Sequence, residues 1–92
     1  MAVTVKLPTQ LRAAAGNATE ATVDGTTVGQ ALDALYSQHG ELRERMADDS
    51  GALRRFVNVY LGGEDIRFLD GLQTPVSDGD ELTILPAVAG GG

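Results

Sequence analysis

The residues with the clearest potential for chemistry are the three glycines that end the chain, Gly90, Gly91 and Gly92. They follow a short apolar segment that contains Val88, and that segment follows a strand-like run. Glycine has no Cβ and adopts backbone angles that other residues avoid, so such a tail can enter a narrow channel and present its carboxylate to another enzyme. The sequence therefore predicts that the chemistry of this protein takes place at a C-terminal glycine carboxylate.

Other reactive groups are few. The sequence has no cysteine, which excludes disulfides, thiolate metal sites and internal thiol nucleophiles. The single histidine, His39, falls at the expected end of a helix, and we interpret it as a surface or capping residue instead of a metal ligand. The acidic groups at 48–49 and 78–81 lack the calcium-loop pattern, and no pair of acids can be assigned to hydrolysis. We therefore expect no catalytic residue, metal or cofactor in the chain itself.

Composition and charge limit the possible partners. The 92 residues can form one small domain, and a content of 42% hydrophobic and 22% charged residues is typical of a globular protein. The formal net charge is -6 and no basic run is longer than Arg54-Arg55, so we expect no nucleic acid partner and faster association with a basic surface on another protein. No stretch reads as a membrane helix or a secretory signal, so we expect a cytoplasmic monomer without membrane contact.

The first part of the chain is predicted to form a β-hairpin. Val3, Val5 and Leu7 alternate with polar residues, which is the period of a strand with one buried face. A polar and alanine-rich connector covers 9–16, and residues 20–24 then read as a second short strand.

An amphipathic helix is predicted to begin after Thr27 and to end near Gly40. Thr27 and Gln30 have the spacing of a capping box, and apolar residues recur with a helical period over 28–36. A second short helix is expected over 41–47.

The last part of the chain is predicted to be mainly β-structure. Residues 56–68 carry a hairpin signal with Gly62-Gly63 at the turn, because a two-residue primed turn requires positive φ angles. Residues 81–85 read as the last strand, which ends at Pro86 because proline cannot continue a hydrogen-bonded ladder.

This order of elements predicts an α+β domain of the β-grasp or ubiquitin-like type, with a mixed sheet of about five strands packed on one main helix. We place the domain at residues 1–89 and a flexible glycine tail at 90–92. The first and last strands would pair in parallel at the centre of the sheet, so the tail would leave from a rigid platform.

Three segments resemble the MoaD/ThiS family of ubiquitin-like sulfur carriers. They are FVNVY at 56–60, EDIRF at 64–68 and DGDELTILPAVAGG at 78–91. The likeness extends over essentially the whole chain and, within the family, is greatest to carriers that serve cysteine synthesis.

The resemblance implies a carrier that catalyses nothing itself. A ubiquitin-activating-like enzyme would use ATP to convert the glycine carboxylate to an acyl adenylate, and sulfide or a persulfide would displace AMP to leave a thiocarboxylate. A pyridoxal-phosphate cysteine synthase would use that sulfur, and a zinc peptidase of the JAMM type would release the attached cysteine. ATP, zinc and pyridoxal phosphate then belong to the partners. The alternatives are a carrier for molybdopterin or thiazole synthesis and a modifier conjugated to lysines.

The family pattern ends in two glycines, whereas this chain ends in three. We favour Gly91 as the activated residue, with Gly92 removed first, and Gly92 itself is the alternative. Gly90 completes the diglycine in the favoured case.

Docking of partners is expected on the sheet face opposite the helix. Alternation places Leu82 and Ile84 together on the core face, which leaves Leu85 as an apolar residue on the other face. The residues expected to contact partners are Leu85, Leu7, Phe68 and Val88.

Overall fold

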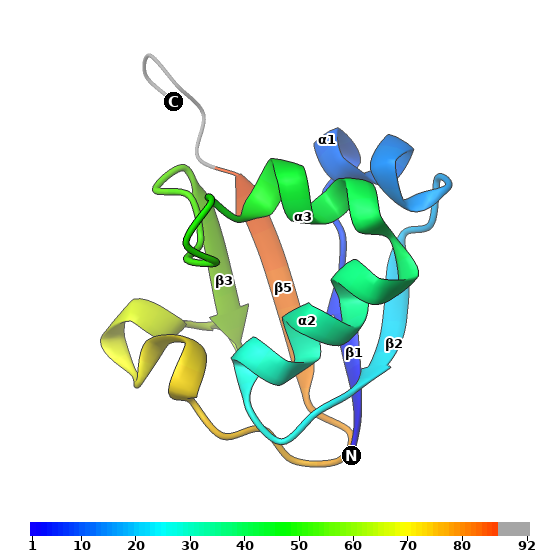
Figure 1. Ribbon diagram of the computed structural model, residues 1–92. Helices are drawn as coiled ribbons and strands as arrows, with labels where there is room; N and C mark the ends of the chain where they lie inside the picture. Colours follow the sequence, from blue (N-terminus) through cyan, green and yellow to red (C-terminus); the bar gives the residue numbers. More distant parts are fainter. Residues whose placement is uncertain (87–92) are drawn as a thin grey trace.

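A mixed five-stranded sheet forms the framework of the computed structural model, which describes residues 1–86 (Figure 1). The strand order is β2-β1-β5-β3-β4. The central pair, β1 and β5, is parallel, and the other neighbours are antiparallel. The strands are β1 (Ala2–Lys6), β2 (Glu20–Asp24), β3 (Val57–Leu61), β4 (Glu64–Asp65) and β5 (Glu81–Pro86). The predicted β-grasp arrangement is confirmed.

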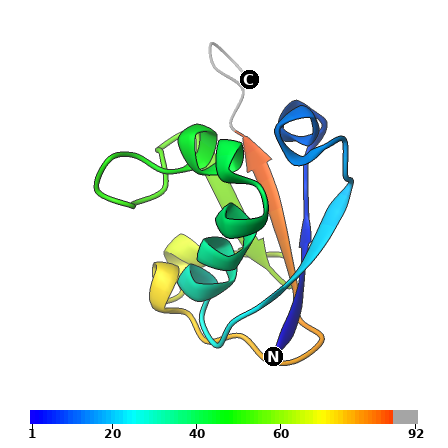
Figure 2. The ribbon, with the colours of Figure 1, turned by 45° about the vertical axis from the view of Figure 1, so that its right-hand side comes forward.

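The longer helices cover one face of this sheet, as the two views in Figures 1 and 2 show. They are α2 (Val28–Gln38) and α3 (Gly40–Met46), and the short α1 (Thr9–Arg12) lies at the end of the sheet where β1 ends. Among residues 1–86 no helix covers the opposite face, which we call the open face. The core lies between the sheet and the helices. Its largest fully buried side chains are Val3, Val5, Val28, Leu32, Leu35, Leu42, Met46, Val57, Val59, Leu82 and Ile84.

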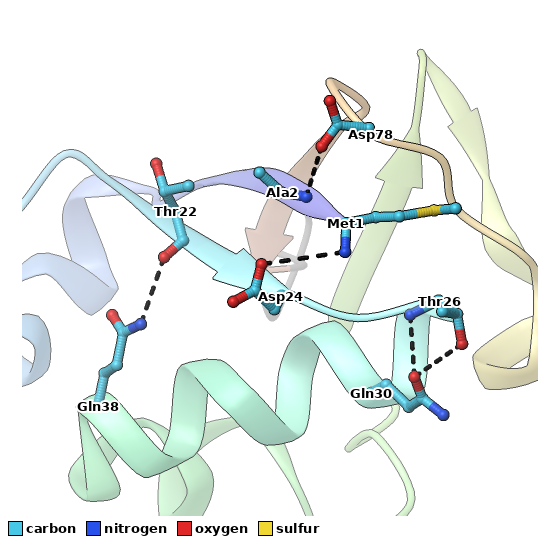
Figure 3. Close-up of polar contacts among 8 residues, drawn as sticks. All are labelled: Met1, Ala2, Thr22, Asp24, Thr26, Gln30, Gln38 and Asp78. Carbon is cyan, nitrogen blue, oxygen red and sulfur yellow. Dashed lines mark hydrogen bonds and ion pairs between the residues drawn. The ribbon is translucent and has the colours of Figure 1, made fainter.

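The start of α2 is held by hydrogen bonds close to the predicted ones. Thr27 Oγ1 accepts from the backbone nitrogen of Gln30 at 3.1 Å, as expected for an N-cap. The side chain of Gln30 does not return to Thr27, however, and instead accepts from the backbone nitrogen of Thr26 at 2.9 Å (Figure 3). Gly25 allows this close packing, because a Cβ there would lie 2.7 Å from the backbone nitrogen of Ala31.

The register between β1 and β5 is fixed at the end of the sheet where these two parallel strands begin. The backbone nitrogen of Ala2 donates to Asp78 Oδ1 at 2.8 Å (Figure 3), and its carbonyl accepts from Gly79 at 2.8 Å. Thr4 then donates to the carbonyl of Asp80 at 3.0 Å. These bonds set where β5 begins, and therefore where its last residue, Pro86, lies relative to β1.

The second hairpin differs from the prediction. Gly62 and Gly63 have φ angles of 59° and 89°, which confirms the primed turn. The strand after the turn contains only Glu64–Asp65, and Ile66–Phe68 forms a 3-10 helix. The prediction of a strand up to Phe68 was wrong, because Asp65 Oδ1 accepts from the backbone nitrogen of Arg67 at 2.8 Å and starts a helical turn that buries Ile66.

Candidate functional site

The predicted site at the C-terminal glycines follows β5 in the chain. β5 is the central strand and pairs with β1 on one side and β3 on the other, up to Pro86. The predicted chemical residues Gly90, Gly91 and Gly92 and the docking residue Val88 lie outside the described residues, as does the predicted domain boundary at residue 89. The open face beside Pro86 is the described surface nearest to these residues in the chain.

Leu85 lies on the open face, as alternation predicts. Its exposed fraction is 47%, whereas Leu82 and Ile84 on the same strand are fully buried. An exposed leucine beside buried neighbours offers apolar surface to another molecule. Its role in docking stays a prediction.

Two other predicted docking residues differ from Leu85. Leu7 lines the same surface groove as Leu85, but it is only 2% exposed because it lies on the core face with Val3 and Val5, so its side chain offers almost no surface for docking. The same alternation that defined the strand predicts this burial. Phe68 is 83% exposed, but its 3-10 helix follows β4, which pairs with the end of β3 farthest from Pro86 (Figure 1).

Three residues near the end of β5 were missed by the sequence reasoning. Phe56 is 48% exposed and directly precedes Val57, which pairs with Pro86. Asn58 is the partner of Leu85 across the antiparallel ladder, so their side chains share the open face. Both residues are placed beside β5 by the register of β3 against β5, and the sequence alone does not give this register.

The third missed residue, Arg67, holds this segment in place. Its guanidinium donates to Asn58 Oδ1 at 2.7 Å and to the carbonyl oxygens of Val57 and Arg55 at 3.0 and 3.2 Å. β4 pairs with β3 only at Tyr60 and Leu61, so the first part of the β3 edge has no strand beside it. The bonds from Arg67 occupy part of this open edge. The turn that carries Phe56 is thereby fixed beside the end of β5.

On the β1 side of Leu85 lies a shallow groove of about 300 Å³. It is bordered by Lys6, Pro8, Arg12 and Leu85. Arg12 Nε donates to the carbonyl of Leu7 at 3.1 Å, which fixes the base of this side chain at the groove. The end of β5 is thus flanked by a groove with two cations on the β1 side and by Phe56 on the β3 side.

The ammonium group of Lys6 is held by two partly exposed carboxylates. It lies 3.5 Å from Glu20 and 3.9 Å from Glu81, both on neighbouring strands. Because all three side chains are about half exposed, these ion pairs contribute little to stability and serve mainly to place the charge.

The titratable groups with displaced pKa values lie elsewhere. Burial, together with the nearby Asp33, raises the pKa of Tyr36 on α2 to about 12. A hydrogen bond from the Ser50 side chain lowers the pKa of Asp48 in the loop after α3. Local packing explains the pKa shift of Tyr36 and loop structure explains that of Asp48. Neither residue lines the groove or pairs with the end of β5.

His39 and the acidic residues form no further site within residues 1–86. His39 joins α2 to α3, with its backbone bonded to Leu35 and Leu42, so the predicted position at a helix end is confirmed. Within residues 1–86 no three His, Cys, Asp or Glu side chains form a metal-binding group, and no helix there has the length and apolar character to cross a membrane.

Comparisons with known proteins agree with this geometry. The model of the ThiS family matches residues 5–91. The sulfur carrier protein CysO of Mycobacterium tuberculosis is 46% identical over 93 residues, which cover 99% of this chain and 100% of the relative. CysO in the Amycolatopsis orientalis BexX/CysO complex superposes with a TM-score of 0.89 at 46% identity, covering 97% of this chain and 99% of that one. Small archaeal modifier protein 1 of Haloferax volcanii is 41% identical over 88 residues, 94% of this chain and 97% of the relative. With a family match over nearly its whole length, this chain belongs to the ThiS family of ubiquitin-like proteins.

Proposed function

We propose that this protein is a sulfur carrier whose terminal glycine carboxylate is converted to a thiocarboxylate. The observation that carries the proposal is the position of β5, which is bonded on both sides and ends at Pro86, four residues before Gly90. A tail that continues from a central strand is presented from a rigid element, and the exposed Leu85 beside it offers a partner a point of contact. The relatives named as sulfur carriers support the same conclusion.

The chemistry explains the need for an activating partner. A carboxylate is a poor acyl electrophile, so one of its oxygens attacks the α-phosphorus of ATP and pyrophosphate leaves. A sulfur nucleophile then attacks the acyl carbon of this adenylate, and AMP leaves with the bonding electrons. When the nucleophile is sulfide, the product is the thiocarboxylate directly. When it is a persulfide, an acyl disulfide forms first and a thiol reductant must cleave its S–S bond.

The partners are proposed on the same basis. The first is a ubiquitin-activating-like enzyme that binds ATP, and a structure of a CysO with a second protein supports the expectation that such carriers form complexes. For the branch that leads to cysteine, the later partners are a pyridoxal-phosphate cysteine synthase that uses the sulfur and a JAMM-type zinc peptidase that frees the carrier afterwards. ATP, pyridoxal phosphate and zinc are bound by those enzymes, and the carrier acts as their co-substrate.

Truncation tests the proposal directly. Removing Gly91 and Gly92 should abolish ATP–pyrophosphate exchange by the activating enzyme while leaving thermal unfolding unchanged, because the described ladder ends at Pro86 and the core lies within residues 3–84. The matched variant lacks only Gly92. It should be adenylated without prior trimming if Gly91 is the activated residue, and should be inactive if Gly92 is. Exchange that survives removal of both glycines would contradict the proposal.

A second function is favoured by the relatives that are named modifiers, small archaeal modifier proteins 1 and 3. Activation of the glycine is the same, but the acyl group is then passed to a lysine amine. Covalent adducts of this chain on other proteins, absent for the variant without Gly91 and Gly92, would support that function. Thiocarboxylate without adducts would support sulfur transfer alone.

A further inference from the structure

The charges of this chain are distributed unevenly over its surface. The net charge is -6, with thirteen carboxylate side chains and seven cationic ones. Four of the seven cations lie around the end of β5, and we call them the basic rim: Lys6, Arg12, Arg55 and Arg67. Two carboxylates, Glu20 and Glu81, lie among them. The rim region therefore has a local charge of +2, and the rest of the chain has -8.

The structure brings the rim together from four separate segments. Lys6 at the end of β1 and Arg12 at the end of α1 border the groove beside Leu85. On the β3 side, the Arg67 guanidinium is bonded to the carbonyl of Arg55 and to Asn58, the ladder partner of Leu85. The cations thus flank an apolar centre formed by Leu85 and Phe56, which are 47% and 48% exposed.

The opposite end of the sheet has the opposite character. Asp24 ends β2 there and Asp78 lies in the loop before β5, both near the N-terminus in Figure 3. β4 adds two further carboxylates at the far end of β3. The segments that form this end, residues 21–33, 59–65 and 69–80, contain no lysine or arginine. The molecule therefore has an acidic end and, where β5 finishes, a basic one.

We propose that the surface around the end of β5 docks onto a partner surface in which carboxylates surround an apolar patch. This inference rests on the proposed function, since the partner in question is the enzyme that adenylates the tail. The net charge alone favours a basic partner surface. The charges that approach the partner in this docking, however, are those of the basic rim around the end of β5. Apolar contact at Leu85 and Phe56 would supply affinity, while the basic rim would supply orientation and speed of encounter.

The separation of charge also orients the carrier before contact. An acidic patch on the partner attracts the basic rim and repels the far end, so productive encounters bring the tail first. Such steering acts over about one Debye length, roughly 8 Å at physiological salt, and weakens as salt is added.

Charge reversal at matched positions tests the inference. Arg55→Glu changes an exposed rim side chain. Arg45→Glu makes the same change of charge on α3, which lies on the helix side of the sheet, and it also removes the ion pair of Arg45 with Glu41 at 3.4 Å. The rate of association with the purified adenylating enzyme should fall roughly three- to tenfold for Arg55→Glu and less than about twofold for Arg45→Glu. The difference should vanish near 0.5 M salt, where the Debye length is only about 4 Å. Glu20→Gln, which removes a carboxylate from the rim region, should increase the rate.

The outcomes separate this inference from the function on which it rests. If neither the full chain nor the chain without Gly92 is adenylated, the proposed function fails and the inference fails with it. If the wild-type chain is adenylated but both reversals slow association equally, the carrier function stands and the rim plays no special part. Faster association of Arg55→Glu would show that the partner surface is basic, which overturns the inference. Thermal unfolding of each variant shows whether a change in rate reflects the surface or the fold.

Discussion

Leu82 and Leu85 lie on the same strand but on opposite faces of the sheet, and this difference leads to a quantitative prediction. Complete burial of a leucine side chain is worth about 1.5–3 kcal/mol. Leu85 is 47% exposed, so only about half of that value stabilises the fold, and Leu85→Glu should lower the free energy of unfolding by about 1 kcal/mol or less. Leu82 is fully buried, and Leu82→Ala should cost about 2–5 kcal/mol.

The exposed half of Leu85 gives the expected effect on docking. Burying it against the activating enzyme would contribute about 1 kcal/mol, or roughly fivefold in affinity. Leu85→Ala should lose most of this contribution. Leu85→Glu should lose more, because its carboxylate would face an apolar patch bordered by acids. Urea unfolding and the KM of the carrier in ATP–pyrophosphate exchange measure the two effects separately. A loss of stability for Leu85→Glu as large as for Leu82→Ala would place Leu85 in the core and refute the reasoning.

Three further predictions concern other parts of the chain. Gly25→Ala should destabilise the fold by about 1–3 kcal/mol, because the added Cβ would lie 2.7 Å from the Ala31 nitrogen, whereas the control Gly40→Ala has open space and should be neutral or slightly stabilising in urea unfolding. Burial raises the pKa of Tyr36 to about 12, so the stability due to its neutral phenol is complete below pH about 10, the unfolded pKa, and declines as the pH rises towards 12. Tyr36→Phe should flatten that decline, and an unchanged pH profile would contradict the assignment. Lys6 is the one lysine of the chain, so any amide between the tail of one copy and a lysine of another must form there, and Lys6→Arg should remove such dimers from a denaturing gel. Dimers that persist in this variant would show linkage to a different group.

Much of the fold could be predicted because local patterns agree with the tertiary structure. Alternation identified β1 and β2, and the helical period with Thr27 as N-cap identified α2. The parallel pairing of the first and last strands followed from the β-grasp order. The short second strand of the 57–65 hairpin could not be obtained in this way, since its end depends on a hydrogen bond that the Asp65 side chain accepts from the backbone nitrogen of Arg67 and on the burial of Ile66.

The candidate site was predicted less completely, and for a different reason. Leu85 could be found because alternation within one strand is a local property. The proximity of Asn58 and Arg67 to Leu85 depends on the β3–β5 register and on a side chain from a separate 3-10 helix. The basic rim likewise requires four segments to meet, so net charge alone gives no sign of it. The burial of Leu7 could have been predicted, because its parity with Val5 already indicates it.

The most direct test of the central claim is the intact mass of this protein isolated from its native cells under thiol-preserving, non-reducing conditions. Sulfur carriage predicts a species ending at Gly91 or Gly92 in which one carboxylate oxygen is replaced by sulfur. A species carrying an added cysteine would in addition assign the carrier to cysteine synthesis. Finding only the unmodified carboxylate, even in cells starved for sulfur metabolites, would contradict the claim.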